Sequence, residues 1–376
     1  MIPLVAPPQR RPVDRALDGP RLDLDLDAVA RNTRAVASAT GAAVMAVVKA
    51  DGYGAGAAAL ARTALANGAT WCGVTGLDEA LALRAAGVTA PVLAWSHPPR
   101  ADLRRAVPAD VDLAVTSPAG LLAVPPGARV HLHLDTGLAR EGATGAEWPL
   151  LCAEAAHAER LGRLRVVGLM SHLACADEPH DPANSLQRRR FDEGVRIARA
   201  AGLRPSVVHL AATAGFSRPG DHLDLVRTGA ALLGIDPLGR DRWQPAVSFQ
   251  APLVGVRPVR AGTPVGYGHT WTAPHDTVLG LLPVGYADGV PRTSGGRVRI
   301  AGRDRPLVGR VSMDQTVVDL GPLPRPGLLV GETAGFFGSG GPRLAEWARW
   351  SDRLEAELLV GLGPRVRRTT STGAAA

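Results

Sequence analysis

Apolar, β-branched runs alternate with helix-forming stretches along the first part of the chain. A strand that is buried on both faces of a parallel sheet shows as a continuous apolar run rather than as a polar–apolar alternation. Helices are predicted between such runs at Ala57–Ala66, Asp78–Ala86, Trp148–Leu161 and Leu186–Ala201. Eight runs read as strands: Val44–Val48, Trp71–Val74, Val92–Trp95, Asp112–Val115, Val130–Leu134, Val166–Met170, Val207–Leu210 and Leu225–Arg227. This alternation predicts an α/β fold, a closed (β/α)8 barrel.

The pattern changes after residue 245 to short valine-rich strands separated by Gly and Pro. Near the N-terminus, the alternation over Arg21–Leu26 predicts a strand that could pair with either domain, followed by a helix capped by Asp27. We predict a disordered Pro/Arg-rich tail (1–20), the barrel (21–245), a mostly β C-terminal domain (246–370) and a short tail (371–376). The predicted strands of the C-terminal domain are Leu253–Val259, Val278–Leu282, Val298–Ile300, Leu307–Val311 and Thr316–Leu320.

Composition and charge argue against several classes of protein. No apolar run reaches the ~18 to 20 residues of a membrane span, so no membrane partner is expected. Residues 1–20 lack the apolar core of a secretory signal, which favours a cytoplasmic protein. The formal charge of +7 comes from scattered arginines without a nucleic-acid-binding motif, so no nucleic acid is expected. Cys72, Cys152 and Cys175 are widely spaced, and His131 and His133 have no third ligand, so neither disulfides nor a metal is expected.

Lys49 is the only lysine in a chain whose lysines and arginines together number 42. A guanidinium stays protonated, whereas a partly desolvated lysine amine can lose its proton and condense with an aldehyde. The alternative, an ordinary surface lysine, fits poorly because Lys49 directly follows the apolar run Val44–Val48 and precedes Gly52. Lys49 is therefore predicted at the C-terminal end of a buried strand, as an amine that forms an imine.

Barrel enzymes carry their chemistry at the C-terminal ends of the strands and often bind phosphate after the last two. Polar residues follow the predicted strands at these ends: Arg140 the fifth, His172 the sixth, Thr213 the seventh and Arg227–Ala230 the eighth. Backbone amides near a helix start bind anions readily. A phosphate-containing ligand is therefore expected on this rim.

Four motifs resemble those of the alanine racemase family, pyridoxal phosphate (PLP) enzymes of fold type III. Val47–Gly54 (VVKADGYG) resembles the family's PLP-lysine motif. Val265–Trp271, Leu282–Gly289 and Gly309–Gln315 resemble three motifs of its C-terminal domain, in order. The resemblance covers roughly Leu22 to Arg368. The PLP homeostasis proteins share the barrel and the lysine but lack the β domain, so these three motifs argue against them.

The resemblance implies a racemase that interconverts L- and D-alanine by a two-base mechanism, supplying D-alanine for peptidoglycan precursors. Lys49 would hold PLP and act as the base on one face of the α-carbon, and Tyr267, from the partner subunit of a homodimer with shared active sites, would act on the other. Arg227 would face the pyridine nitrogen, which makes the ring a weaker electron sink and favours racemisation over transamination.

The resemblance also assigns the binding residues. Tyr53, Thr213 and the amides of Gly229 and Ala230 would clamp the phosphate, and His172 would orient Arg227. Arg140 would approach the substrate carboxylate, Met313 of the partner would bind it, and Tyr286 would narrow the entry. A packed core tyrosine is the alternative for any one aromatic, but all three tyrosines of the chain lie in these motifs.

Three positions depart from the family pattern. His133 replaces a lysine that is often carbamylated, so a negative charge beside Arg140 is lost unless another anion replaces it. Ala212–Thr213 replaces an Asn-Ser pair, and Ala356 stands where a phosphate-contacting tyrosine is usual. Three alternatives follow: a racemase of serine or another small amino acid, a PLP decarboxylase, which Arg227 disfavours, and a PLP-binding protein without turnover.

Overall fold

The computed structural model describes residues 18–293, 295–323 and 326–372, so most of the predicted N-terminal tail and the end of the C-terminal one lie outside the described part. The chain divides into two compact units. One is Leu24–Val247, and the other is Ser248–Thr369 together with the N-terminal residues up to Asp23. The described residues contain no helix with the length and apolarity that a bilayer crossing requires.

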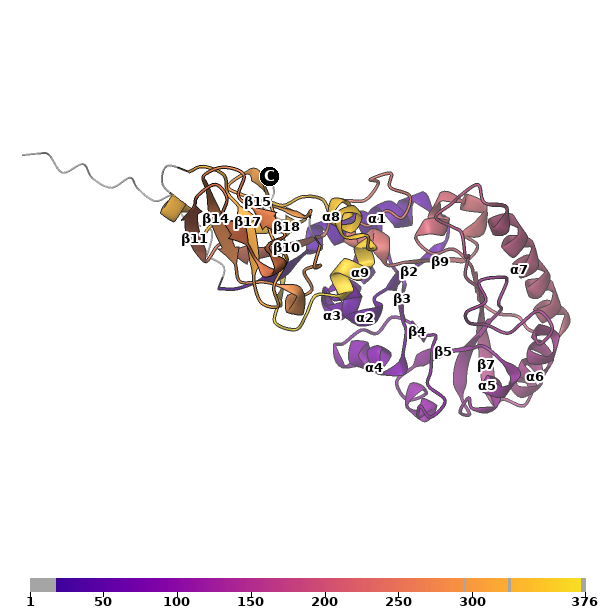
Figure 1. Ribbon diagram of the computed structural model, residues 1–376. Helices are drawn as coiled ribbons and strands as arrows, with labels where there is room; N and C mark the ends of the chain where they lie inside the picture. The colour runs from indigo at the N-terminus through magenta and orange to yellow at the C-terminus, as the bar shows by residue number, and fades with distance from the viewer. Residues whose placement is uncertain (1–17, 294, 324–325, 373–376) are drawn as a thin grey trace, which may run out of the picture. The chain divides into compact units, whose positions relative to one another are not determined.

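The first unit is a parallel β/α barrel (Figure 1). Its sheet has the order β8-β7-β6-β5-β4-β3-β2-β9, and β9 returns to β8 through hydrogen bonds from Asp224 N to Val208 O (3.1 Å) and from Arg227 N to Ala211 O (3.0 Å). The predicted barrel and all eight predicted strands are confirmed, each within two residues of its bounds. The strands are β2 Ala43–Val47, β3 Trp71–Val74, β4 Val92–Ala94, β5 Val111–Val115, β6 Ala128–His133, β7 Leu164–Met170, β8 Val207–His209 and β9 Leu225–Thr228.

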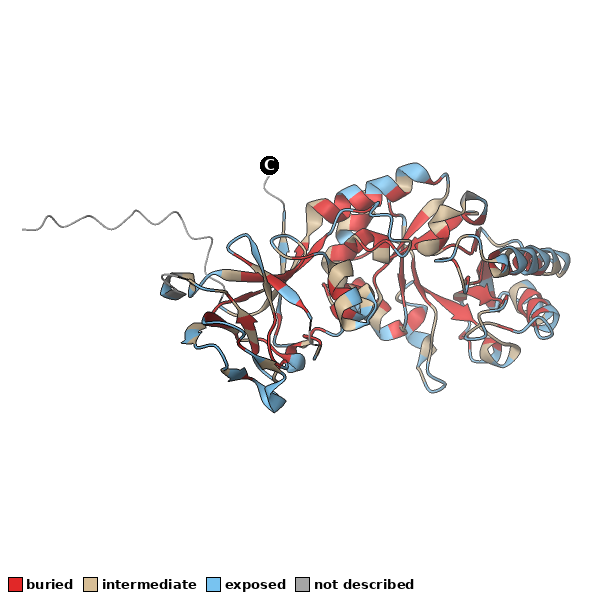
Figure 2. Cartoon of the chain, turned by 45° about the horizontal axis from the view of Figure 1, so that its top comes forward, coloured by how far each residue is buried: buried red, intermediate tan, exposed pale blue. Residues whose placement is uncertain are grey.

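Helices surround these strands, and Figure 2 shows the strands buried while the helices expose one side. This distribution follows from the sequence, because each helix carries one apolar stripe and the strands are mainly apolar on both faces. The helices are α1 Leu26–Ala39, α3 Ala57–Leu65, α4 Leu77–Ala85, α5 Pro118–Leu122, α6 Trp148–Arg160 and α7 Pro182–Ala200. Shorter turns are α2 Lys49–Tyr53, η1 Leu103–Ala106, η2 Ala214–Ser217, η3 Pro219–Asp221 and η4 Ala230–Leu233.

Two helix starts differ from the prediction. The carboxylate that caps α1 is that of Asp25, which accepts from Ala28 N at 2.9 Å, so the assignment of the cap to Asp27 was wrong. Helix α7 begins at Pro182 rather than Leu186, because Asp181 caps it and Pro182 occupies its first turn, where a missing N–H costs nothing.

The second unit is built of antiparallel strands, as predicted. Its largest sheet has the order β16-β15-β18-β10-β1-β19, so the N-terminal strand β1 pairs beside β10. A three-stranded sheet, β11-β14-β17, and the pair β12-β13 complete it. The strands are β1 Arg21–Asp25, β10 Val247–Pro252, β11 Gly255–Val259, β12 Pro264–Val265, β13 Trp271–Thr272, β14 Thr277–Leu282, β15 Arg297–Ile300, β16 Arg303–Pro306, β17 Thr316–Asp319, β18 Thr333–Phe337 and β19 Arg367–Ser371. Its helices and turns are η5 Tyr267–His269, η6 Tyr286–Asp288, η7 Pro326–Leu329, α8 Leu344–Ser351 and α9 Glu355–Val360.

Two predicted strands of this unit need correction. The strand predicted over Leu253–Val259 is two residues shorter, because Leu253 and Val254 lie between the end of β10 at Pro252 and the start of β11 at Gly255. The run Leu307–Val311 forms no strand beyond one bridge from Leu307 to Val318. Ala301 (φ 49°) and Gly302 (φ 76°) form a two-residue hairpin turn, so the partner of β15 starts already at Arg303 and ends at Pro306.

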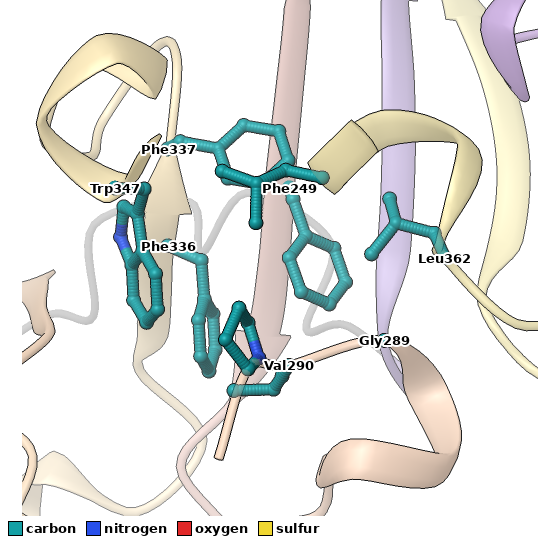
Figure 3. Close-up of a pocket in the computed structure, with 9 residues that line it drawn as sticks. Phe249, Gly289, Val290, Phe336, Phe337, Trp347 and Leu362 are labelled. Carbon is teal, nitrogen blue, oxygen red and sulfur yellow. The ribbon is translucent and has the colours of Figure 1, made fainter. Parts of the chain in front are cut away.

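Aromatic side chains form the core of the second unit (Figure 3). The ring of Phe336 lies 5.0 Å from that of Phe249 and 5.7 Å from that of Trp347, measured between centroids. Such tilted contacts are the favoured packing of aromatic rings. Gly289, at the end of the motif Leu282–Gly289, lines the same small cavity as these rings.

Candidate active site

Lys49 lies directly after β2, at the start of a left-handed turn. Val48 N donates to Gly73 O at 2.9 Å, which extends the β2–β3 pairing to the residue before the lysine. Ala50, Asp51 and Tyr53 then adopt φ values of 52°, 51° and 58°. A left-handed conformation costs a non-glycine residue roughly 1–2 kcal/mol, so neighbouring contacts must hold the turn.

Two carboxylates provide those contacts. Asp51 Oδ1 accepts from Ala57 N at 2.9 Å, at the start of α3. Glu79 Oε1 accepts from Ala50 N at 2.7 Å, while its Oε2 accepts from Thr75 N at 2.8 Å. These contacts fix the turn to the start of α3 and to the loop that follows β3, and Lys49 is presented at the C-terminal end of the barrel.

The Lys49 amine is half-buried, and its pKa is lowered. Burial is the main cause, the positive charge of Arg140 adds to it, and Glu79 and Glu141 partly oppose it. The ring centroid of Trp95 lies 6.0 Å from Nζ. A lowered pKa increases the fraction of neutral amine, which is the form that attacks an aldehyde.

Tyr53 and Gly229 form a close-fitting pair on the same rim. A Cβ at Gly229 would lie 2.4 Å from Tyr53 Oη and 2.8 Å from Val47 O, so only glycine leaves this space open. Burial raises the pKa of Tyr53 to about 12, so its phenol remains a hydrogen-bond donor at neutral pH. Gly229 N donates to Thr213 Oγ1 at 3.4 Å, and Ala230 begins the η4 turn, whose first amides have no acceptor within it. A phenol and backbone amides are suitable hydrogen-bond donors to a phosphate. The residues predicted to bind the PLP phosphate therefore have the chemistry that this role requires.

Gly229→Ala is expected to weaken PLP binding about tenfold to a hundredfold. Overpacking of a filled site typically costs about 1–3 kcal/mol, and each 1.4 kcal/mol corresponds to a tenfold change in Kd. Equilibrium dialysis of PLP against the variant measures the effect. Gly145→Ala is the matched control, because a Cβ at Gly145 meets nothing within 4 Å. Unchanged PLP affinity in Gly229→Ala would contradict the phosphate clamp.

Arg227 is buried at the end of β9 and is held by five hydrogen bonds. Its Nη2 donates to Ser171 O (2.8 Å), Leu210 O (3.0 Å) and His172 Nδ1 (3.0 Å), and its Nη1 donates to His209 Nδ1 (2.9 Å) and His209 O (3.3 Å). Burial lowers the pKa of Arg227 to about 10, which still leaves the guanidinium charged at neutral pH. The predicted contact between His172 and Arg227 is therefore present.

His172 is neutral, and a hydrogen bond to its backbone carbonyl holds it in position. Burial, followed by the charges of Arg227 and Arg140, lowers the pKa of His172 to about 3. Gln187 Nε2 donates to His172 O at 3.1 Å and to Thr136 Oγ1 at 3.2 Å, and its Oε1 accepts from Ala174 N at 2.8 Å. This one side chain on α7 thus ties the loop of His172 to the loop that precedes Arg140.

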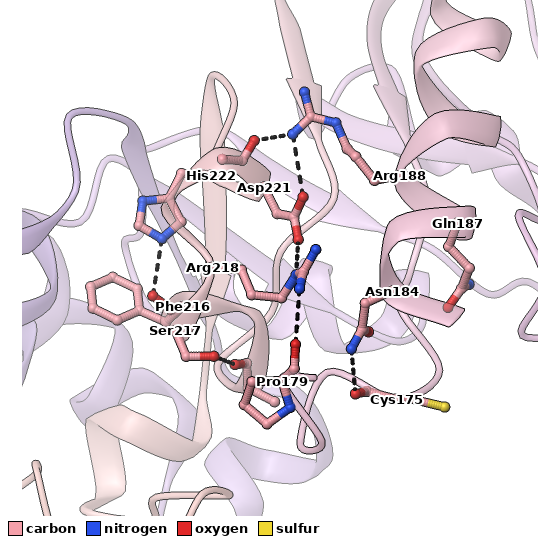
Figure 4. A network of polar contacts seen from close by, with 12 residues as sticks. Cys175, Pro179, Asn184, Gln187, Arg188, Phe216, Ser217, Arg218, Asp221 and His222 are labelled. Carbon is pink, nitrogen blue, oxygen red and sulfur yellow. Dashed lines mark hydrogen bonds and ion pairs between the residues drawn. The ribbon is translucent and has the colours of Figure 1, made fainter. Parts of the chain in front are cut away.

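The loops that follow β7 and β8 are also joined farther from the site (Figure 4). Arg218 Nε donates to Asp221 Oδ2 at 2.7 Å, and its Nη1 donates to Pro179 O at 2.9 Å. Asn184 Nδ2 donates to Cys175 O at 2.9 Å. The segments that bear His172 and Thr213 are therefore anchored to one another and to α7.

Arg140 and His133 line one small pocket with His172, Ser171, Asp135 and Glu141. Burial and then the charges of Arg227 and Arg140 lower the pKa of His133 to about 4, so its imidazole is neutral. No hydrogen-bond partner for His133 Nδ1 exists among the described residues. His133 does not supply the negative charge of a carbamylated lysine, and the acidic residues that line the same pocket are Asp135 and Glu141.

The three C-terminal motifs meet within the second unit. A Cβ at Gly285 would lie 2.2 Å from Ser312 O, and Tyr286 N donates to that same oxygen at 3.0 Å. A Cβ at Gly309 would lie 2.8 Å from Val265 O, which brings the Tyr267 loop against the same segment. Tyr267, Met313 and Tyr286 are 67%, 53% and 42% exposed, respectively. The structure thus gathers the predicted residues into two groups, one on the barrel rim and one on the surface of the second unit.

Sequence reasoning missed several residues of the barrel group. Gln187 gave no signal, because a glutamine on a predicted amphipathic helix reads as a surface residue. The sequence indicates for His131 only a possible metal ligand, yet its imidazole contacts His209 and Asp112. The signal that could have found Asp112 is a carboxylate inside an otherwise apolar strand. The described residues contain no group of three or more His, Cys, Asp or Glu that could hold a metal ion.

Comparison with known proteins matches the chain to two family models, the alanine racemase N-terminal domain over residues 24–237 and the alanine racemase C-terminal domain over residues 246–370. The alanine racemase of Mycolicibacterium vanbaalenii is 46% identical over 93% of this chain and 94% of its own. The structure of alanine racemase from D-cycloserine-producing Streptomyces lavendulae has a TM-score of 0.90 and 38% identity, covering 95% of this chain and 98% of its own. That of Bartonella henselae, with covalently bound pyridoxal phosphate, has a TM-score of 0.84 and 25% identity, covering 94% of this chain and all of its own.

These matches span both units and almost the whole length of the relatives, so they cover the β unit as well as the barrel. The chain belongs to the alanine racemase family.

Proposed function

We propose that this chain is a PLP-dependent racemase that interconverts L- and D-alanine with two bases. The observation that carries the proposal is the sole lysine, half-buried with a lowered pKa, at the end of the first barrel strand, near the closely fitting pair Tyr53 and Gly229. Bound PLP, attached to Lys49, supplies the electron withdrawal that makes the α-proton of an amino acid removable.

The residues of the chain divide the remaining work. Lys49 Nζ, once free of its covalent bond, takes or returns a proton on one face of the α-carbon. The phenol of Tyr267 does the same on the opposite face, so a proton removed on one side and replaced on the other inverts the carbon. Arg227 would face the ring nitrogen of bound PLP and would give it no proton, because a guanidinium remains charged. The imidazoles of His172 and His209 and three backbone carbonyls hold this guanidinium in place. Arg140 and the backbone of Met313 orient the carboxylate, and Tyr286 narrows the entry.

We also propose a homodimer in which Tyr267 and Met313 serve the barrel of the partner subunit. Their exposure of 67% and 53% supports this assignment, since a reacting phenol left on a free surface would have no substrate to act on. The proposed location is the cytoplasm, and the proposed role is supply of D-alanine for peptidoglycan precursors.

Deuterium exchange at Cα of L- and D-alanine in D2O tests the two-face assignment. With purified protein and PLP, the wild type is expected to exchange both enantiomers. Tyr267→Phe is expected to lose exchange from one enantiomer at least about a hundredfold more than from the other, because general acid–base groups contribute about 10²–10⁴-fold. Equal exchange from both enantiomers in this variant would refute the assignment of Tyr267.

A further inference from the structure

Three polar side chains lie side by side in the barrel interior beneath Arg227. His209 on β8 and His131 on β6 are 0% exposed, and Asp112 on β5 is 1% exposed. Burial of polar groups is unfavourable unless each is hydrogen-bonded, and apolar residues would fill the same space without that requirement. Their presence in the core therefore calls for a reason beyond packing.

The side chains form a continuous row of hydrogen bonds. Arg227 Nη1 lies 2.9 Å from His209 Nδ1, His209 Nε2 lies 2.9 Å from His131 Nδ1, and His131 Nε2 lies 3.3 Å from Asp112 Oδ2. Asp112 Oδ1 in turn accepts from Arg129 Nε at 2.6 Å. The row thus runs from the rim of the barrel to a partly exposed arginine on β6.

The direction of every bond in this row is fixed by its first member. A guanidinium can only donate, so His209 Nδ1 must carry a lone pair, and the proton of neutral His209 must be on Nε2. That proton points at His131 Nδ1, which must therefore accept, and the proton of His131 must be on Nε2, facing the carboxylate. Asp112 can only accept while it is ionised, so it completes a chain in which no other arrangement of protons satisfies all the partners.

The surroundings of His131 hold it in this row. β6 and β7 change register after Val130, which sets Gly168 opposite His131. A Cβ at Gly168 would lie 2.1 Å from His131 Nδ1, so any other residue would displace the imidazole. The Trp71 ring meets the imidazole edge-on, with centroids 5.6 Å apart. The absence of a side chain at Gly168 therefore leaves the space that the His131 imidazole occupies.

We propose that Asp112 and His131 are positioning residues for the racemisation: together they set the tautomer of His209 and so hold the Arg227 guanidinium against the ring nitrogen of the cofactor. This inference rests on the proposed function, which places Arg227 at that nitrogen. A loosened Arg227 admits water or a proton to the nitrogen and strengthens the ring as an electron sink. More alanine then loses its amino group to PLP, in the side reaction that converts alanine and PLP into pyruvate and pyridoxamine phosphate.

Proton positions are the first test, because they do not depend on turnover. Long-range proton–nitrogen correlation spectra of the holoenzyme with isotope-labelled histidine distinguish the two tautomers, and His131→Phe identifies the two signals. We expect both His131 and His209 to be neutral with the proton on Nε2. A proton on Nδ1 of either ring, or a doubly protonated ring, would overturn the proposal.

Asp112→Asn is the sharpest variant, because it keeps the shape of the side chain. Arg129 requires an acceptor, so the amide oxygen of the new asparagine faces Arg129 and its NH2 group faces His131. His131 Nε2 must then accept, so the protons of His131 and His209 move to Nδ1. The Nδ1 proton of His209 would face the donating Arg227 guanidinium. We expect kcat to fall about tenfold or more, as for other residues that orient a contacting group, with KM for alanine changed much less. Pyruvate released per racemisation event is expected to rise.

Leu113→Ala is the control, since its fully buried side chain on the same strand points away from the row. It is expected to lower the melting temperature without raising the pyruvate ratio. If Asp112→Asn lowers the melting temperature but leaves kcat and the pyruvate ratio at wild-type values, the positioning role is refuted. A wild type without racemase turnover would instead refute the proposed function, and the spectra would still report on the row.

Discussion

Lys49→Arg is expected to lower alanine racemisation by at least about 10⁴-fold, because one substitution removes both the covalent attachment of PLP and one of the two bases. Arginine keeps a positive charge at this position but stays protonated at any working pH, so it neither attacks an aldehyde nor accepts a proton. Racemisation is followed by circular dichroism of the alanine solution at saturating PLP.

Borohydride reduction gives this experiment a second readout. The wild type, reduced in the presence of PLP, is expected to carry the label on the peptide that contains Lys49, and the variant is expected to carry none there. Because the 376 residues contain no other lysine, no second side chain can take the label in its place. Arg140→Gln serves as the control, since it changes the charge near the amine but leaves the amine itself. Substantial turnover in Lys49→Arg would exclude Lys49 as the PLP-binding base.

Mixing two inactive variants is expected to restore activity from nearly zero to about one quarter of the wild type, if the active sites are shared across a two-fold dimer. Lys49→Arg supplies an intact Tyr267, and Tyr267→Phe supplies an intact Lys49. In a mixed dimer, one site then has both native residues and the other has neither. Random exchange makes half of the dimers mixed, and half of their sites are intact.

The measurement is turnover after the two purified variants are unfolded and refolded together, with each variant refolded alone as the control. Light scattering of the same samples gives the mass of the assembly. If the mixture stays as inactive as its components while the assembly is dimeric, Lys49 and Tyr267 serve the same site within one chain, and the shared-site proposal fails.

The barrel was predictable because its signal is local and repeated. Each buried parallel strand is a continuous apolar run, so β2 to β9 were found within two residues of their bounds. Helix caps and hairpin turns depend on the positions of a few atoms, so the sequence did not predict them. Asp25 and Asp27 both precede an apolar helix face, and only the geometry shows that the Asp25 carboxylate reaches Ala28 N. The hairpin turn at Ala301–Gly302 likewise decided that β16 begins before the run Leu307–Val311.

Some residues of the candidate site could likewise be predicted from the sequence, and others could not. Residues that stand in motifs or directly after strands, such as Lys49, Tyr53 and Arg227, were identifiable from the sequence. The row beneath Arg227 was not, because it joins side chains 18, 78 and 19 positions apart on separate strands. Such contacts appear only when the barrel closes, since neither histidine has a recognisable sequence neighbour.

Because Lys49 is half-buried and is the only lysine of the chain, acylating reagents can be used to count active sites in this protein. In most enzymes, activated esters attack many surface lysines, and inhibition cannot be assigned to any one of them. In the coenzyme-free protein, each lysine side chain that is acylated corresponds to one accessible active site. Guanidinium groups do not react with these reagents at neutral pH. The N-terminal amine also reacts, but it lies on a different peptide, so the stoichiometry of acylation at the peptide that contains Lys49 reports how many centres in a preparation are open to solvent.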